Sequence, residues 1–404
     1  MNSKLMPVEE ALAAILSHVK PVVAVETVPV LQALGRVLAT DQYSEIDVPP
    51  CDNSAMDGYA LRYADLAENN HELVVGQRIP AGHLGEPLKS ATAARIFTGA
   101  AIPPGADTVV MQEDTELLAK VVRINTAVKF GQHIRPRGQD IASGSVVVHK
   151  GKRLQPQDIG LLASIGATEV EVFKRLSVAV MSTGDELVEP GEPLAEGQIY
   201  NSNRYTLSAL LMALGCDVVD GGIVADDFSS TCDQLNASAE KADLIISTGG
   251  VSVGEEDHIK AAVTSLGELA LWKLNIKPGK PLAFGVVGGT PFFGLPGNPS
   301  SVFVTFCLLA RPYVLRCQGQ VDVAPSITHA VADFNWSRRG SRQEYLRARV
   351  MNSDVGSVVE LYPNQGSGLL ASASWANGLV ILPPETTVVK GDTISVILLS
   401  ELLR

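Results

Sequence analysis

Several features common in proteins of this length are scarce in this sequence, and each scarcity excludes a class of function. Aromatic residues make up 5% of the 404 residues, and the five cysteines form no CxxC pair and no zinc-finger spacing. An odd number of irregularly spaced cysteines argues against a disulfide framework and indicates a reducing compartment. The Gly-x-Gly-x-x-Gly and Gly-Lys-Ser/Thr signatures of nucleotide binding are also missing.

Positive charge and long apolar runs are lacking as well. The net charge is −12 and the pI is about 5.1, a field that repels phosphate backbones and excludes nucleic acid as the expected partner. No run approaches the roughly 18 apolar residues of a membrane span, and the N-terminus carries Glu9 and Glu10 in place of a signal core. The sequence predicts a soluble, cytoplasmic protein in which any anionic substrate must meet a local basic cluster.

What the chain does have is an alternation of strand-like and helix-like stretches, which predicts a multidomain α/β fold. Between residues 176 and 320, short buried strands alternate with helices, so we expect a central doubly wound, mostly parallel sheet covered on both faces. Ligands of such sheets bind in the crevice beyond the carboxyl ends of the strands. The predicted strands are Ser177–Met181, Asp217–Val219, Leu244–Ser247 and Ala270–Leu274, and the predicted helices are Arg204–Leu214, 228–240, Asp257–Leu266 and 299–316.

Three further domains are expected around this one. Residues 44–143 read as an inserted β-rich domain with short strands and Gly/Pro turns. It interrupts an α/β N-terminal domain made of residues 1–43 plus 144–175, which begins with a helix opened by Pro7. Residues 321–404 are predominantly strand-like and predict a C-terminal β-barrel-like domain.

Two loops that follow predicted strands of the central sheet could bind an anion, one rich in glycine and one, the lysine loop, with two lysines. The loop from Ser247 to Asp257 has three glycines, two hydroxyls beyond the end of the predicted strand and a following helix, which is the composition of an anion cradle. A tight strand-to-helix connection explains the same residues. The loop Ile276–Pro281 holds Lys277 and Lys280, with Lys273 just upstream, and lysines suit phosphate or tetrahedral oxyanions. A solvated turn is the alternative there.

Carboxylates lie beside several of these loops. Hard oxygen ligands clustered in this way suit Mg²⁺ that bridges to a substrate phosphate, whereas singly each is a helix cap or a solvated turn residue. The stretch from Leu295 to Ser300, taken alone, is a capped helix start. The carboxylates in question are Asp57, Asp140, Asp185, Glu186, Asp226, Asp227 and Asp257.

Taken together, the chain resembles the molybdopterin molybdenumtransferases, a family that includes bacterial MoeA and the E domain of gephyrin. The order and spacing match from about Pro7 to Arg316, and more weakly in the last domain through Asn364–Ser367. The matching motifs are Asp52–Ala60, Thr98–Ala100, Val110–Glu113, Ile134–Ile141, Ser182–Leu187, Gln198–Tyr200, Ser247–Gly254, Ile276–Pro281 and Leu295–Pro299.

The resemblance implies a homodimer of four-domain subunits whose cleft lies between the parallel-sheet domain of one subunit and the inserted domain of the other. It implies insertion of molybdenum from molybdate into adenylylated molybdopterin, with Mg²⁺ assisting and AMP released. Molybdopterin adenylyltransferase and acceptor molybdoenzymes would be its protein partners. A dithiolene supplies its own sulfurs, so the absence of catalytic cysteines is expected.

Roles for individual residues also come from the resemblance. Asp57, Glu186, Asp226 and Asp257 would be catalytic, the last three also holding the metal. The substrate and oxyanion contacts would be Thr98, Asp140, Thr183, Gly184, Asp185, Ser247, Gly249, Gly250, Ser252, Gly254, Lys273, Lys277, Pro278, Lys280, Asn298, Arg347 and Ser367.

Two other functions compete with this one. The molybdopterin adenylyltransferase that acts one step earlier shares the Thr-Gly-Gly-Val-Ser loop and the sheet, but it would not need the segment from Met1 to Phe173 or the last domain. A non-catalytic pterin carrier or scaffold would not need Asp57, Glu186 and Asp257.

Overall fold

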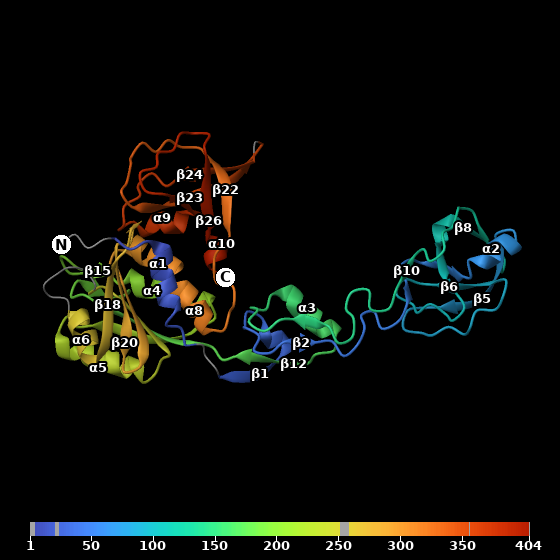
Figure 1. Ribbon diagram of the computed structural model, residues 1–404, viewed down its shortest axis with the longest axis horizontal. Helices are drawn as coiled ribbons and strands as arrows, with labels where there is room; N and C mark the ends of the chain where they lie inside the picture. The colour runs from blue at the N-terminus through green and yellow to red at the C-terminus, as the bar shows by residue number, and fades with distance from the viewer. Residues whose placement is uncertain (1–4, 21–23, 251–257, 355, 404) are drawn as a thin grey trace. The chain divides into compact units, whose positions relative to one another are not determined.

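The computed structural model describes residues 5–20, 24–250, 258–354 and 356–403, and it divides into two compact units (Figure 1). Unit 1 comprises Met1–Glu26, Gly35–Ala39 and Glu171–Arg404, and unit 2 comprises Thr27–Leu34 and Thr40–Val170. The division falls within β1 (Val25–Pro29) and β12 (Glu169–Phe173).

The main sheet of unit 1 has six strands in the order β16-β13-β17-β21-β20-β18. The first four run parallel, and β20 alone runs in the opposite direction, because it pairs antiparallel with β21, to which a short turn joins it, and with β18. The sheet is therefore mostly parallel, as predicted, whereas the hairpin of β20 and β21 was not predicted from the sequence. Their bounds are β13 (Ser177–Thr183), β16 (Asp217–Val224), β17 (Leu244–Thr248), β18 (Gly267–Lys273), β20 (Pro281–Val287) and β21 (Thr290–Leu295).

Helices cover both faces of this sheet, because the strands are apolar on both sides. Val178 and Val180 of β13 face one core with α1 and α4, while Ala179 and Met181 face another with α5 and α6. Figure 1 shows α5 and α6 together on the second face. The helices are α1 (Val8–Leu16), α4 (Ser202–Ala213), α5 (Phe228–Ala239) and α6 (His258–Leu266), and a short pair, β14 (Leu187–Val188) and β15 (Ile199–Tyr200), precedes α4.

The long helix predicted over 299–316 is present but is not uniformly α-helical. It consists of α7 (Pro299–Thr305), a π-helical segment η3 (Phe306–Ala310) and α8 (Arg311–Cys317). By length and composition, Pro299–Cys317 is the one described helix that could cross a membrane, yet 94% of its apolar window is buried inside the protein. It is therefore a core helix.

The C-terminal strands of unit 1 close on themselves. The sheet order is β19-β23-β24-β22-β26-β25, and β23 also pairs with β25, which closes a five-stranded barrel. This agrees with the β-barrel-like fold predicted from the sequence. The strands are β19 (Ile276–Lys277), β22 (Ile327–Ala332), β23 (Gln343–Ser353), β24 (Gly356–Leu361), β25 (Gly378–Leu382) and β26 (Thr393–Leu398), with α9 (Leu370–Trp375) and α10 (Leu399–Leu402) beside them.

Unit 2 is built around a six-stranded sheet in the order β7-β4-β6-β5-β9-β8, in agreement with the β-rich block predicted there. Its strands are β4 (Gly58–Leu61), β5 (Glu72–Ile79), β6 (Thr92–Ile96), β7 (Thr108–Met111), β8 (Thr115–Leu118) and β9 (Val121–Ile124). The rest of the unit contains β2 (Gln42–Tyr43), β3 (Asn53–Ser54), β10 (Ile134–Arg135), β11 (Val146–Val148), η1 (Val30–Ala33), η2 (Gln112–Asp114), α2 (Ala64–Glu68) and α3 (Pro156–Ser164).

Candidate functional site

A cavity of about 490 Å³ lies at the carboxyl ends of β17 and β21 in unit 1. Segments that are far apart in the sequence line it: the loop after β17, the lysine loop (Ile276–Pro281), the loop before α7, and residues of the C-terminal barrel. The lining residues are Gly249, Gly250, Lys277, Pro278, Gly279, Lys280, Pro281, Pro296, Gly297, Asn298, Ser301, Arg342, Gln365, Gly366 and Ser367.

The lysine loop is a closed turn that packs tightly on α7. The backbone N–H of Leu274 donates to the carbonyl of Lys280 at 2.7 Å, which closes the turn. Gly279 has a φ of +102°, and a Cβ there would lie 2.2 Å from Oγ1 of Thr305. Only glycine fits this position, and its fit holds Lys277 and Lys280 on the cavity wall.

Lys277 is fixed by a carboxylate that sequence reasoning did not single out. Its Nζ lies 3.1 and 3.0 Å from the two oxygens of Glu344, whose residue is 3% exposed. Parallel pairing of β19 with β23 sets this contact, because it places Lys277 opposite Glu344. The ammonium is therefore held in place at the wall, and little conformational entropy is left to lose on binding.

Two more cations line the same cavity. The Arg342 guanidinium donates a hydrogen bond of 3.0 Å to the carbonyl of Ile276, and this bond links the segment before β23 to the start of the lysine loop. Lys280 is exposed, and no ion pair involves it among the described residues. Three cationic side chains therefore surround the cavity in a chain whose net charge is −12.

The glycine loop after β17 approaches the end of β13 closely. A Cβ on Gly249 would lie 2.6 Å from the carbonyl oxygen of Thr183, and one on Gly250 would lie 2.6 Å from Ile259. Both glycines have positive φ, at +88° and +61°. Glycine is therefore required at both positions, and the cavity is lined there by backbone, as in an anion cradle.

Several predicted contacts lie behind this wall or outside the described residues. Ser247 is fully buried in β17, and Thr183 is also buried. Lys273 is exposed on β18 and does not line the cavity. Ser252, Gly254 and Asp257 belong to the stretch 251–257, which lies outside the described residues.

Arg347 does not line the cavity but supports the loop that does. Its side chain is 1% exposed and donates to the carbonyl of Gly366 at 2.9 Å and to Oγ of Ser372 at 3.0 Å. Burial lowers the pKa of Arg347 to about 10, so it stays charged at neutral pH. The Gln365 amide adds two hydrogen bonds to Arg347, so Gly366 and Ser367 are held against the cavity.

Three acidic residues of unit 1 lie on loops at the carboxyl ends of the neighbouring parallel strands β13 and β16. Asp185 and Glu186 follow β13, and Asp226 follows β16; all three are exposed. The backbone N–H of Asp226 lies 3.4 Å from Oδ1 of Asp185, which brings the two loops together. Among the residues that the structure describes, no three metal-ligating side chains form a cluster.

In unit 2, Asp57 and Thr98 are in direct contact. Oδ1 of Asp57 accepts hydrogen bonds from the backbone N–H and from Oγ1 of Thr98, both at 2.8 Å. These bonds, with a smaller contribution from the Arg95 charge, lower the pKa of the Asp57 carboxyl. Asp140, in the same unit, is exposed and pairs through its backbone with Val48.

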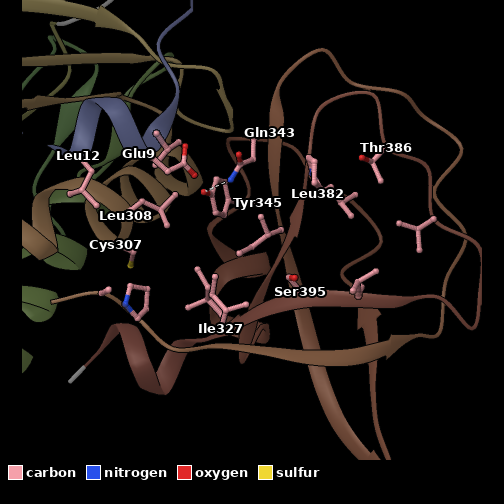
Figure 2. Close-up of a pocket in the computed structure, with 18 of the residues that line it drawn as sticks. Glu9, Leu12, Cys307, Leu308, Ile327, Gln343, Tyr345, Leu382, Thr386 and Ser395 are labelled. Carbon is pink, nitrogen blue, oxygen red and sulfur yellow. Dashed lines mark hydrogen bonds between the residues drawn. The ribbon is translucent and has the colours of Figure 1, made fainter. Parts of the chain in front are cut away.

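A second, larger cavity in unit 1 contains none of the predicted site residues. It has a volume of about 670 Å³ and lies between α1, η3 and the C-terminal barrel (Figure 2). Its wall is mainly apolar, with the carboxylates Glu9 and Asp392 among its polar groups. Gln343 donates to Tyr345 Oη at 2.7 Å there, and burial raises the pKa of Tyr345. Such a wall does not attract an anion.

Comparison with known protein families covers most of the chain. Three family models match: the MoeA N-terminal region (domain I and II) at residues 6–166, a probable molybdopterin binding domain at 179–316, and the MoeA C-terminal region (domain IV) at 329–399.

Similar proteins span nearly the same length. A molybdopterin molybdenumtransferase of Haemophilus influenzae is 40% identical over 369 residues, 90% of this chain and 91% of that protein. Molybdopterin molybdenumtransferase 2 of Mycobacterium tuberculosis is 38% identical over 91% of this chain and 93% of its own. A crystal structure of the molybdopterin biosynthesis MoeA protein of Pyrococcus horikoshii OT3 matches with a TM-score of 0.84 at 30% identity, covering 98% of this chain and 100% of that chain.

Proposed function

The chain belongs to the MoeA family of molybdopterin molybdenumtransferases and takes part in molybdenum cofactor biosynthesis, and from this premise we propose its reaction. It transfers molybdenum from molybdate to adenylylated molybdopterin and releases AMP and the molybdenum cofactor. The observation that carries this proposal is the cationic cavity of about 490 Å³ at the strand ends of unit 1.

Molybdate is a tetrahedral dianion, and it binds in this cavity. Lys277, Lys280 and Arg342 supply the positive charge, and Ser301 and Ser367 supply hydroxyl groups. Because Lys277 is already held by Glu344 and Arg342 by Ile276, the site is organised before the oxyanion arrives. Lys273 would contribute only long-range charge.

The pterin phosphate binds at the glycine loop that forms another wall of the same cavity. Gly249 and Gly250 line the cavity with backbone, and the exposed Asn298 lines the same cavity. Asn298 occupies the cap position of α7 without making a side-chain capping bond, so its amide remains available to a ligand. Ser252 and Gly254 extend this loop in the proposal.

Magnesium fits the acidic loops of unit 1. Mg²⁺ binds through one or two carboxylates together with substrate phosphates and water, so a three-residue cluster is not required. Glu186 and Asp226 would hold it, since both are exposed on loops joined by the contact between Asp226 and Asp185. The bound ion would neutralise charge that develops on the phosphoanhydride. Asp257 is the third carboxylate of the proposal.

The remaining parts of the proposal concern assembly and location. The protein is a cytoplasmic homodimer of four-domain subunits, and Asp57, Thr98 and Asp140 of one subunit complete the cleft of the other. Asp57 would orient the water that cleaves the adenylate, because its lowered pKa keeps it a carboxylate at neutral pH. Its protein partners are molybdopterin adenylyltransferase and acceptor molybdoenzymes.

Single-turnover conversion of adenylylated molybdopterin by the purified protein with Mg²⁺ tests the proposal. AMP and metallated cofactor are followed with and without molybdate. Formation of both products that depends on molybdate supports the insertase. Tight binding without AMP in either condition would indicate a carrier, and adenylylation of molybdopterin by ATP would indicate the preceding enzyme.

A further inference from the structure

Two arginines lie opposite each other near the carboxyl ends of β5 and β6, two neighbouring strands of the six-stranded sheet of unit 2. Arg78 of β5 is paired in register with Arg95 of β6, and their guanidinium carbons lie 4.5 and 4.4 Å from the centroid of the Phe97 ring. Like charges directly opposite on neighbouring strands destabilise a sheet. Within the described part of the chain, no carboxylate forms an ion pair with either arginine, and both guanidinium groups stack on the ring of Phe97.

The two arginines are held differently. Arg95 donates to the carbonyls of Gly58 at 2.8 Å and Ile96 at 3.1 Å and to the side chain of Gln112. Arg78 is exposed, and among the described residues its guanidinium stacks on the ring without a hydrogen bond or an ion pair. One guanidinium is therefore fixed while the other keeps all its donors free for a ligand.

The arginine pair lies at the same end of the strands as Asp57 and Thr98. β4 begins at Gly58, directly after Asp57, and it runs antiparallel to β6, which ends two residues before Thr98. β5 runs parallel to β6 and ends directly after Arg78. The charge of Arg95 also contributes to the lowered pKa of Asp57. Two cations, a carboxylate and a hydroxyl are thus presented together.

We infer that Arg78 and Arg95 bind the phosphoanhydride of the adenylylated pterin, an inference that rests on the function proposed above. An anhydride carries negative charge on two adjacent phosphates, and planar guanidinium groups recognise phosphate oxygens through paired hydrogen bonds. Asp57, which accepts its bonds from Thr98, then lies beside the bond that is cleaved. Molybdate keeps its own site in unit 1, so this arginine pair recognises the organic substrate alone.

Substitution of Arg78 tests the inference, because the side chain is exposed and carries no backbone contact. Arg78→Gln is expected to weaken binding of adenylylated molybdopterin about tenfold or more, as measured by equilibrium titration. Arg78→Lys retains the charge and recovers part of that affinity. In single-turnover reactions of Arg78→Gln, the concentration of molybdate for half-maximal rate stays unchanged.

Arg123→Gln is the matched control. Arg123 lies on β9 opposite Glu72, at the other end of β5, where it pairs with Glu72 and Glu116. The Arg123→Gln substitution removes the same charge from the same sheet, and it is expected to leave the affinity for adenylylated molybdopterin unchanged.

The outcomes separate this inference from the proposed function. If wild-type protein releases AMP in a molybdate-dependent reaction and Arg78→Gln binds the adenylylated substrate like wild type, the inference is overturned and the function stands. An equal loss of affinity in Arg123→Gln and Arg78→Gln also overturns it, because net charge alone then explains the effect. If wild type releases no AMP, the proposed function itself fails.

Discussion

The cationic cavity and the larger apolar cavity of unit 1 share a strand of the C-terminal barrel but present opposite surfaces to a ligand. Along β23 and the residue before it, Gln343 and Tyr345 line the larger cavity, whereas Arg342 lines the smaller one and Glu344 anchors its lysine. Successive side chains of a strand point to opposite sides, so one stretch of four residues serves both cavities.

This contrast shows that volume alone does not identify the site. The larger cavity, about 670 Å³, has a mainly apolar wall with the carboxylates Glu9 and Asp392. The smaller one, about 490 Å³, has three cations and backbone exposed at glycines. For a dianionic substrate the electrostatic difference decides between them.

The largest effect is expected from removing a cation of the smaller cavity. Lys280→Gln should lower molybdate-dependent turnover about 100-fold, comparable to the loss of one oxyanion-binding donor in other enzymes. Lys273→Gln is the matched control: it removes the same charge from the same chain segment, but Lys273 does not line the cavity. Equal losses in both variants would show that overall charge, and not the cavity, governs the reaction.

A smaller effect is expected at Glu344, which acts through Lys277. Glu344→Gln removes the ion pair that fixes the ammonium, so the apparent KM for molybdate should rise about fivefold, with that for adenylylated molybdopterin unchanged. Gln343→Leu, one position away on the wall of the other cavity, should change neither constant. A loss of thermal stability with both KM values unaltered would reduce Glu344 to a purely structural role.

The smallest effect is expected from filling the larger cavity. Ser395 lies on its wall (Figure 2), and Ser395→Phe should occupy part of the space. Turnover should stay within about twofold of wild type, because Ser395 does not line the smaller cavity. A large fall in turnover with the thermal transition unchanged would assign a catalytic role to the larger cavity and break the contrast.

The sequence could predict which loops meet but not every side chain that meets there. Glycine and lysine loops follow strands whose carboxyl ends share one sheet edge, and that rule was enough to bring Gly249, Lys277, Lys280 and Asn298 together. The fold class followed in the same way from the alternation of strands and helices.

Other parts of the site depend on pairing between distant segments, which no local pattern reveals. Arg342 and Glu344 were missed because they reach the lysine loop only through the pairing of β19 with β23. Arg347 and Ser247 resemble ligand residues by type, yet the structure buries both. Whether a strand residue faces the cavity or the core depends on register, and here register is set by the barrel and the sheet.

The position of the oxyanion tests the central claim most directly. Crystals of the protein soaked with molybdate would be measured at the molybdenum absorption edge, where anomalous scattering locates the metal without assumptions about the ligand. The account predicts a peak in the smaller cavity, within hydrogen-bonding reach of Lys280 and Arg342. A peak in the larger cavity, or none in the smaller one at concentrations that support turnover, would contradict it.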